Sequence, residues 1–389
     1  MESGRSFIVS TRYSLSYYLV KYQLYWLSYL PLPIPWYNKT VSVFCYFVCL
    51  VYLMRVIIYI FVPLEPPLAL YLGDFAYDSD SLHDFIWSIL SCWLTASVFA
   101  FHLLDQTNRS VKLQAWFVHL SILEKGKDHF FKKPNKKLVF ASKLLFINLK
   151  TTLLCCPSFA FCLFIPHVIN NCSNIPLVIV LLVHGLTTFI AALTGVTFCV
   201  SLSYLFAFYA FLVGQKLTYI SEVFKCHKSS HRKILSNSNQ LISLLQQAYC
   251  ADFFWSKLNA YVFLATFFAQ IFIIYSVFFI PLDKIHFICL IGLGLINFTC
   301  GQSVNFVCGV YARSKLNDCQ KQLIRVIFIK DAKLRVSLKI KLLIISEYLL
   351  PRKLFAIFGS LEMTSINYLK VFTEMAIHLF LVILNANRK

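Results

Sequence analysis

The sequence predicts an all-α, polytopic membrane protein with seven transmembrane helices, a cytosolic N-terminus and an extracellular C-terminus. Three observations lead to this fold class. The 389 residues are 59% hydrophobic and 14% charged, whereas soluble domains are typically about 45–50% apolar and about 25% charged. Apolar stretches of about 20 residues, which suffice to cross a bilayer, recur along the chain. The loops between these stretches differ strongly in their content of Lys and Arg.

Seven stretches have the length and composition of membrane-spanning helices. They cover residues 39–61, 82–104, 138–166, 177–213, 256–280, 286–311 and 360–384. The third and fourth stretches are longer than a bilayer requires, so we expect these helices to tilt or to continue beyond the membrane as packed cytosolic helices. Strands of about ten residues with alternating polarity, which form outer-membrane barrels, do not recur in the sequence.

The distribution of Lys and Arg predicts the orientation of the spans. Segments 1–38, 105–137, 214–255 and 312–359 carry three, eight, five and eleven of these residues, respectively. Segments 62–81 and 167–176 carry none, segment 281–285 carries one and the C-terminal tail carries two. Because basic residues concentrate on the cytosolic side, we place the first group in the cytosol. Asn171, in a predicted outer loop, begins a candidate glycosylation sequon, Asn-Cys-Ser.

This topology divides the chain into four regions. They are a cytosolic N-terminal arm (1–38), six transmembrane helices with their cytosolic loops (39–311), a cytosolic helical anchor (312–359) and the seventh helix with a short outer tail (360–389). In 234–253 and 319–349, apolar residues mostly recur every three or four positions, which is typical of amphipathic helices. We expect these helices to pack against one another or against other subunits. The alternative is that they lie on the inner leaflet of the membrane.

The composition argues against several classes of function. The net charge of +19 does not indicate a nucleic-acid-binding protein, because the basic residues lie in loops that flank the membrane, where they set the topology and contact anionic lipid. The fourteen cysteines lie mostly within predicted spans and act there as small apolar residues. No nucleophile, zinc-protease or phosphate-binding motif is present in the sequence. We therefore expect neither an enzyme nor a bound metal or cofactor.

The seventh span carries titratable residues that are costly inside a bilayer. Lys370, Glu374 and His378 follow one another at a spacing of four, and a charge at the bilayer centre costs about 2.5–3.5 kcal/mol on insertion scales. Since each residue turns a helix by about 100°, Glu374 and His378 lie about 40° and 80° from Lys370, and Ile377 and Leu381 lie within about 20° of it. We place Phe372, Leu379, Phe380 and Ile383 on the opposite, apolar face.

Two interpretations of this polar sector are open. In the first, Lys370 and Glu374 neutralise each other inside a helix bundle, although Lys before Glu is the weaker order for such a pair. In the second, the sector faces water in a pore, where a ring of acidic side chains selects cations and Ile377 and Leu381 form a hydrophobic constriction. One such helix cannot enclose a pore, so the second interpretation requires a symmetric oligomer with this span around its axis.

The C-terminal third resembles a known receptor superfamily. Residues 342–359 read LLIISEYLLPRKLFAIFG, a leucine-rich helix, a turn with Pro and Arg, and a Phe-rich segment that ends in Gly. Together with seven spans, an inner N-terminus, large inner loops and a very short outer C-terminus, this pattern is similar to that of the insect gustatory and odorant receptors. The gustatory branch usually ends with Thr-Tyr, five apolar residues and Gln-Phe. Here the apolar residues 379–383 are kept, but Ile377-His378 and Leu384-Asn385 replace the signature pairs, so the chain resembles a divergent gustatory receptor.

The resemblance implies a chemosensory receptor subunit that acts as a ligand-gated, non-selective cation channel in the plasma membrane. Its implied partners are a small-molecule tastant or odorant, monovalent and divalent cations, membrane lipid, and related subunits in a homo- or heterotetramer. The inner helices would form an anchor where subunits meet, and the last span would line the pore with Lys370, Glu374, Ile377, His378 and Leu381. The ligand pocket would lie in the outer half among spans two to six, with candidate lining residues His184, Thr187, Gln270, Tyr275 and Asn297.

Two other classes of membrane protein are alternatives. A seven-helix G-protein-coupled receptor would have the opposite orientation, and the sequence lacks Asp-Arg-Tyr at the end of span three and Asn-Pro-x-x-Tyr in the last span. A membrane transporter is the other alternative, because further charges are placed within spans, at Arg55, Lys143 and Lys150. However, the spans show neither an inverted repeat nor a pair of helices broken by Gly or Pro.

Overall fold

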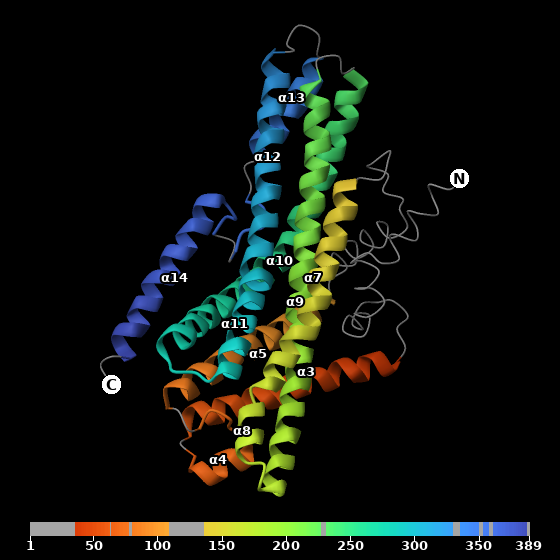
Figure 1. Cartoon of the computed structure of the whole chain (residues 1–389). Helices are drawn as coiled ribbons and strands as arrows, with labels where there is room; N and C mark the ends of the chain where they lie inside the picture. Colours follow the sequence, from red (N-terminus) through yellow and green to blue (C-terminus); the bar gives the residue numbers. More distant parts are fainter. Residues whose placement is uncertain are drawn as a thin grey trace.

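The computed structural model describes residues 36–62, 64–77, 80–108, 136–226, 231–329, 335–349, 353–357 and 361–386. Figure 1 shows these residues as an assembly of long helices. Their β structure is one isolated antiparallel bridge between Ile357 and Leu361. The predicted N-terminal arm lies outside the described residues except for 36–38, which begin a helix, so its cytosolic position stays a prediction.

Each of the seven predicted spans corresponds to a helical segment. The segments are α3 (Trp36–Phe61), α5 (Asp80–Asn108), α7 (Lys136–Cys162), α9 (Ile175–Lys225), α10 (His231–Phe279), α11 (Lys284–Ile296) with η1 (Asn297–Ser303) and α12 (Val304–Ile329), and α14 (Ser365–Ala386). Six of them are long and apolar enough to cross a membrane, and the apolar part of α3, Tyr46–Phe61, is shorter. An all-α, multi-pass membrane protein is therefore confirmed. The orientation stays a prediction, and "outer" and "inner" below follow it.

Two helices continue far beyond the length that a membrane requires. α9 has 51 residues and α10 has 49, or about 75 Å each at about 1.5 Å per residue, against a hydrocarbon core of about 30 Å. The expected continuation of the fourth span is thus confirmed. The amphipathic segment 234–253 and the fifth span form one continuous helix. The third span ends earlier than predicted, at Cys162, where a turn leads into the short helix α8 (Ile165–Asn170).

The inner ends of α9, α10 and α12 pack with α13 (Val336–Ile344) and η3 (Ile345–Leu349) into one hydrophobic core, called the inner core below. It buries most of the predicted apolar stripes, namely Ile234, Leu241, Leu244, Leu245, Ala248, Leu323, Ile327, Leu338, Leu342 and Ile345. Leu235, Phe253 and Ile324 belong to the same stripes but are exposed. These helices therefore bury their apolar faces mainly against one another, as expected.

A residue in the left-handed conformation joins the inner core to the last helix. Phe355 has a φ of 59°, which is uncommon for a residue with a bulky side chain. Its N–H donates to the Asp252 carboxylate at 2.9 Å, and its buried ring contacts Phe206 and Tyr209 edge-on. These contacts hold the chain on α9 and α10 shortly before α14 begins.

The outer ends of the first helices enclose polar groups with defined partners. The buried Asp74 carboxylate accepts a hydrogen bond from the Trp87 indole at 3.0 Å and lies 2.9 Å from Nε2 of His83. In α3, the guanidinium of Arg55 donates to the carbonyl of Leu72, the last residue of the short helix α4 (Pro66–Leu72). A positive charge at this end of a helix complements the helix dipole. Arg55, a charge within a predicted span, thus stabilises the end of α4.

Candidate functional site

α14 is the least buried of the helical segments that are long enough to span a membrane. Only 11% of its apolar window is buried, against 33–50% for the other five segments of this kind. Figure 1 shows α14 beside the other helices and inclined to α12. Most of the α14 surface is therefore available to lipid or to another subunit.

One face of α14 packs against α10. This face consists of Val371, Met375, Leu379 and Val382, which lie against Phe263, Phe267 and Ile271. His378 lies at the edge of the same face, with its ring edge-on to that of Phe267 at 5.6 Å between centroids. Nδ1 of His378 donates to the Glu374 carbonyl at 2.8 Å. The imidazole is thus held toward α10, and a pore-lining role for it stays a prediction.

The opposite face of α14 carries the predicted polar sector. Lys370 and Glu374 are both exposed, and the ion pairs found among the described residues do not join them. Ile377 and Leu381 are 48% and 49% exposed and lie about one and two turns further toward the outer end. The geometry therefore gives no support to mutual neutralisation of Lys370 and Glu374 inside one subunit.

The predicted apolar face needs one correction. Leu379 and Ile383 are partly buried, as expected, and the Phe372 ring contacts a ring of η1 at 6.0 Å. Phe380, assigned to the same face, is instead 59% exposed. It lies ten residues after Lys370, so a turn of about 100° per residue puts it about 80° from Lys370 rather than opposite to it. Phe380 therefore borders the exposed sector.

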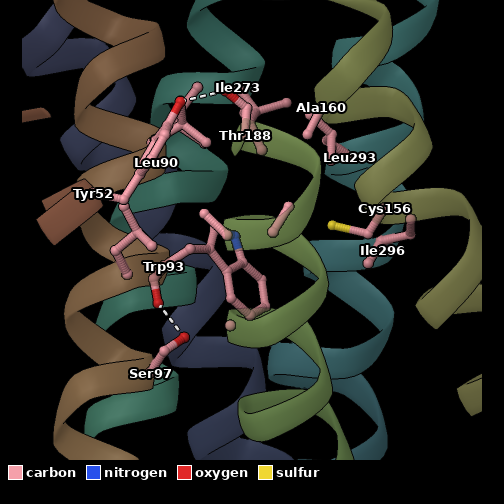
Figure 2. A pocket seen from close by; sticks show the side chains of 15 residues that line it. Tyr52, Leu90, Trp93, Ser97, Cys156, Ala160, Thr188, Ile273, Leu293 and Ile296 are labelled. Carbon is pink, nitrogen blue, oxygen red and sulfur yellow. Dashed lines mark hydrogen bonds between the residues drawn. The ribbon is translucent and has the colours of Figure 1, made fainter. Parts of the chain in front are cut away.

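A small cavity lies among the helices between the middle and the outer end of the predicted membrane region. Figure 2 shows Tyr52 and Trp93 on one side of it and Ala160, Cys156 and Leu293 on the other. Its lining comes from α3, α5, α7, α9, α10 and α11 and is mostly apolar, and its volume is about 60 Å³. One water needs about 10–15 Å³ on this scale. A ligand of more than a few heavy atoms must therefore displace side chains of the lining.

Hydrogen bonds within the protein occupy most of the polar groups of the cavity. The Thr188 hydroxyl donates to the His184 carbonyl at 2.8 Å, so it accepts a hydrogen bond from the Tyr52 hydroxyl. The Ser97 hydroxyl donates to the Trp93 carbonyl at 2.8 Å. The indole N–H of Trp93 makes no hydrogen bond within the part of the chain that the structure describes. The cavity thus offers an apolar lining whose strongest available donor is the indole N–H of Trp93.

His184 and Thr187, two of the predicted pocket residues, lie on α9 beside the cavity but outside its lining. Nε2 of His184 donates to the Tyr71 carbonyl at 3.0 Å. The Thr187 hydroxyl donates to the carbonyl of His184 at 2.8 Å. Both side chains therefore serve contacts within the protein, and their contact with a ligand stays a prediction.

Gln270, Tyr275 and Asn297, the other predicted pocket residues, also lie outside the lining. The Asn297 amide donates to the Gln270 side chain and to the Thr266 carbonyl, both at 2.8 Å. The Tyr275 ring packs against that of Phe85 at 4.5 Å. These residues hold helices together around the cavity, and a role in ligand contact stays a prediction for them as well.

Trp93 is a cavity residue that the sequence patterns did not single out. Tryptophan in membrane helices is enriched at the two membrane interfaces, whereas Trp93 lies near the middle of the predicted span 82–104. A tryptophan at mid-span was therefore a usable signal. The candidate glycosylation residue Asn171 follows α8, and its amide donates to the His167 carbonyl at 2.9 Å, so its modification stays a prediction.

Comparisons with known proteins identify the fold. No protein-family model and no curated protein matches the sequence. Among solved structures, the chain is similar to the insect olfactory receptor OR5 from Machilis hrabei, with a TM-score of 0.58 and 9% sequence identity. The likeness covers 94% of this chain and 98% of that receptor. The chain therefore shares the fold of this receptor, as the resemblance in the C-terminal third of the sequence led us to expect.

Proposed function

We propose that the protein is a subunit of an oligomeric, ligand-gated cation channel with a chemosensory role at the plasma membrane. The observation that carries this proposal is the exposed face of α14, which aligns Lys370, Glu374, Ile377 and Leu381. The fold shared with an insect olfactory receptor supports the proposal. The sequence resemblance of residues 342–385 to gustatory receptors supports it independently.

The charges on α14 determine what can cover its exposed face. A charged side chain in contact with lipid tails costs several kcal/mol, and such residues almost always face a bundle interior or a water-filled cavity. No helix among the described residues covers Lys370 and Glu374. Copies of the subunit arranged around an axis would turn this face toward a shared aqueous channel, while Val371 and Met375 stay packed on α10. By resemblance, we expect four subunits.

The order of side chains along α14 fits a gated cation pore. From the inner to the outer end, the exposed face presents Lys370, Glu374, Ile377 and Leu381. Rings of acidic side chains favour cations, and apolar constrictions close a pore by excluding water. Lys370 lies one turn from the Glu374 ring and offsets part of its charge. We therefore expect a pore with weak selectivity among cations, closed at Ile377 and Leu381.

The cavity is the natural site for the activating ligand. Its small volume, apolar lining and single available indole donor suit a small, mostly apolar molecule with one hydrogen-bond acceptor, such as an odorant or a tastant. A ligand that displaces side chains of the lining favours a conformation with a larger cavity. Ligand binding would open the channel if the pore is wider in that same conformation. A transporter receives less support, because Arg55, one of the charges that kept this alternative open, caps α4.

Neutralising Glu374 is the direct test of the pore. In cells that express the protein with related subunits, Glu374→Gln should lower the permeability of divalent relative to monovalent cations by about twofold or more, because the acidic ring loses its charge. Glu362→Gln is the matched control, since Glu362 pairs with Arg313 at 3.5 Å before α14 begins. An unchanged permeability ratio in a conducting Glu374→Gln channel would exclude Glu374 from the pore.

A separate measurement tests the orientation on which the proposal rests. An epitope tag at the C-terminus should bind antibody on intact, unpermeabilised cells, because the topology places that end outside. A tag that is reached only after permeabilisation would contradict the topology and favour a G-protein-coupled receptor. Absence of any current from protein at the cell surface, with all related subunits tried, would contradict the channel itself.

A further inference from the structure

Four buried amide side chains lie on α10 and on the segment η1–α12 that packs against it. They are Asn259 of α10, Asn297 and Gln302 of η1, and Asn305 of α12, called the amide seam below, and each is at most 5% exposed. The two segments run antiparallel, so Asn297 lies level with Gln270 while Asn305 lies level with Asn259. The seam thus extends along the contact between predicted spans five and six.

Several polar atoms of the amide seam have no hydrogen-bond partner among the residues that the structure describes. They are the side-chain oxygens of Asn297 and Asn305, the side-chain nitrogen of Asn259, and both the oxygen and the nitrogen of Gln302. The one hydrogen bond that joins seam residues to each other, from Asn305 to Asn259, is long at 3.4 Å. Buried polar groups of native proteins are nearly always satisfied, if not by protein then by ordered water.

The chemistry of the unpartnered atoms suits water better than a metal ion. Donors and acceptors occur together, on Asn259 and Gln302 as donors and on Asn297, Gln302 and Asn305 as acceptors. A buried water typically makes about three hydrogen bonds and uses both its hydrogens and its lone pairs. A cation, by contrast, would require oxygen atoms alone. The mixed set therefore favours water as the ligand.

The backbone next to the seam departs from the α-helix. η1 is a seven-residue π-helix, in which hydrogen bonds skip one residue more than in an α-helix. A Cβ atom at Gly301 would overlap the Thr266 side chain, so the glycine lets η1 and α10 approach closely at this level. Such π segments occur often at functional sites, and conversion to α-helical bonding would turn the following residues by one position.

η1 also connects the cavity to the last helix. Leu293 and Ile296, immediately before η1, line the cavity. At the other end, the Ser303 hydroxyl lies 3.0 Å from the Tyr368 hydroxyl of α14. A change of hydrogen-bond register in η1 would therefore move groups that contact both the cavity and α14.

We propose that the amide seam is a buried water site, and that its waters let η1 change register between the cavity and α14. The water site stands on the unpartnered amides alone, whereas the use of the register change in gating rests on the channel function proposed above. Waters exchange hydrogen bonds at little cost, so they can follow the amides of the seam as η1 turns. A dry seam would hold η1 in one register.

Backbone hydrogen exchange on the purified protein in lipid nanodiscs tests the site without ligand, current or partner subunit. Peptides that cover 297–303 should exchange about tenfold faster than those that cover 287–293 in α11, because water reaches the η1 backbone. In the double variant Gln302→Leu/Asn305→Leu, the ratio of the two exchange rates should fall by about fivefold or more. A change of this size corresponds to roughly one hydrogen bond. If the double variant does not fold, Asn305→Leu alone should reduce the difference in part.

Thr299→Val is the matched control, because Thr299 is an exposed η1 residue whose hydroxyl bonds its own helix at the Leu295 carbonyl, 2.7 Å away. This variant should leave the exchange of η1 unchanged. Exchange in η1 as slow as in α11 would show a dry seam and overturn the proposal. So would fast exchange in η1 that the seam variants do not slow. Either result would leave the channel function untouched, which the Glu374→Gln permeability measurement tests separately.

Discussion

The inner core and α14 are built from the same kind of helix, yet they end in opposite environments. Both carry an apolar stripe on one face and polar residues on the other. The inner core buries its stripes within one chain, so that Trp255 and Phe206 have almost no exposed surface. α14 buries one face on α10 and leaves Ile377 and Leu381 about half exposed. An amphipathic pattern thus indicates that a helix has a partner, and the structure tells whether that partner belongs to the same chain.

Truncation of a large aromatic side chain should separate the two regions most clearly. Trp255→Ala in the inner core should lower the free energy of unfolding by about 3–5 kcal/mol, because it leaves a cavity among packed rings. Phe380→Ala on α14 should cost less than about 1 kcal/mol, since this ring is largely exposed. Denaturation of purified single subunits in detergent measures both variants. Equal losses would show that α14 is packed within the subunit, contrary to the comparison.

The sequence predicted what depends on local pattern and missed what depends on several helices at once. Hydropathy identified the spans. The spacing of apolar and polar residues identified the apolar stripes that include Leu241 and Leu342, and the polar sector with Lys370 and Glu374. The cavity around Trp93 arises where six helices meet, and no single segment encodes its lining. The predicted pocket residues were chosen for their polarity. Inside a membrane protein, however, polar side chains such as Asn297 mainly form hydrogen bonds with backbone groups and neighbouring side chains.

An apolar-to-polar change on the exposed face of α14 should affect conduction rather than folding. Ile377→Thr weakens the apolar contact that closes the pore, so the basal current of the channel should rise, by about fivefold for each 1 kcal/mol lost from the closed state. Val382→Thr is the control, because Val382 faces α10 instead of the exposed sector. Whole-cell recording without ligand measures the basal current. A rise for Val382→Thr and none for Ile377→Thr would place the pore on the other face of α14.

The buried carboxylate that anchors Phe355 gives the inner core a pH dependence. Burial raises the pKa of the Asp252 carboxyl to about 6, although the hydrogen bond from the Phe355 N–H opposes the rise. Asp252 precedes the predicted span 256–280 on its inner side. Because the folded state favours the protonated form, its contribution to stability is greatest below the unfolded pKa of about 3.8 and is lost as the pH rises through about 6.

Acidification from pH 7 to pH 5 should therefore raise the contribution of Asp252 to the free energy of unfolding by about 1 kcal/mol. Asp252→Asn keeps an acceptor for the Phe355 N–H and removes the titration. The difference in denaturation midpoint between pH 5 and pH 7 should consequently be smaller in the variant than in the parent. The same pH difference in both proteins would exclude Asp252 as its source.

The smallest expected effect lies at the contact between η1 and α14, where the two regions are joined. The Ser303 and Tyr368 hydroxyls should couple by about 0.5–1.5 kcal/mol in a double-mutant cycle of Ser303→Ala and Tyr368→Phe, the usual worth of one hydrogen bond. Thr299→Val combined with Tyr368→Phe should be additive, because Thr299 bonds its own helix. Coupling of equal size in isolated subunits and in the assembled oligomer would show that each subunit holds its own α14. Coupling confined to the oligomer would mean that assembly brings α14 into this contact.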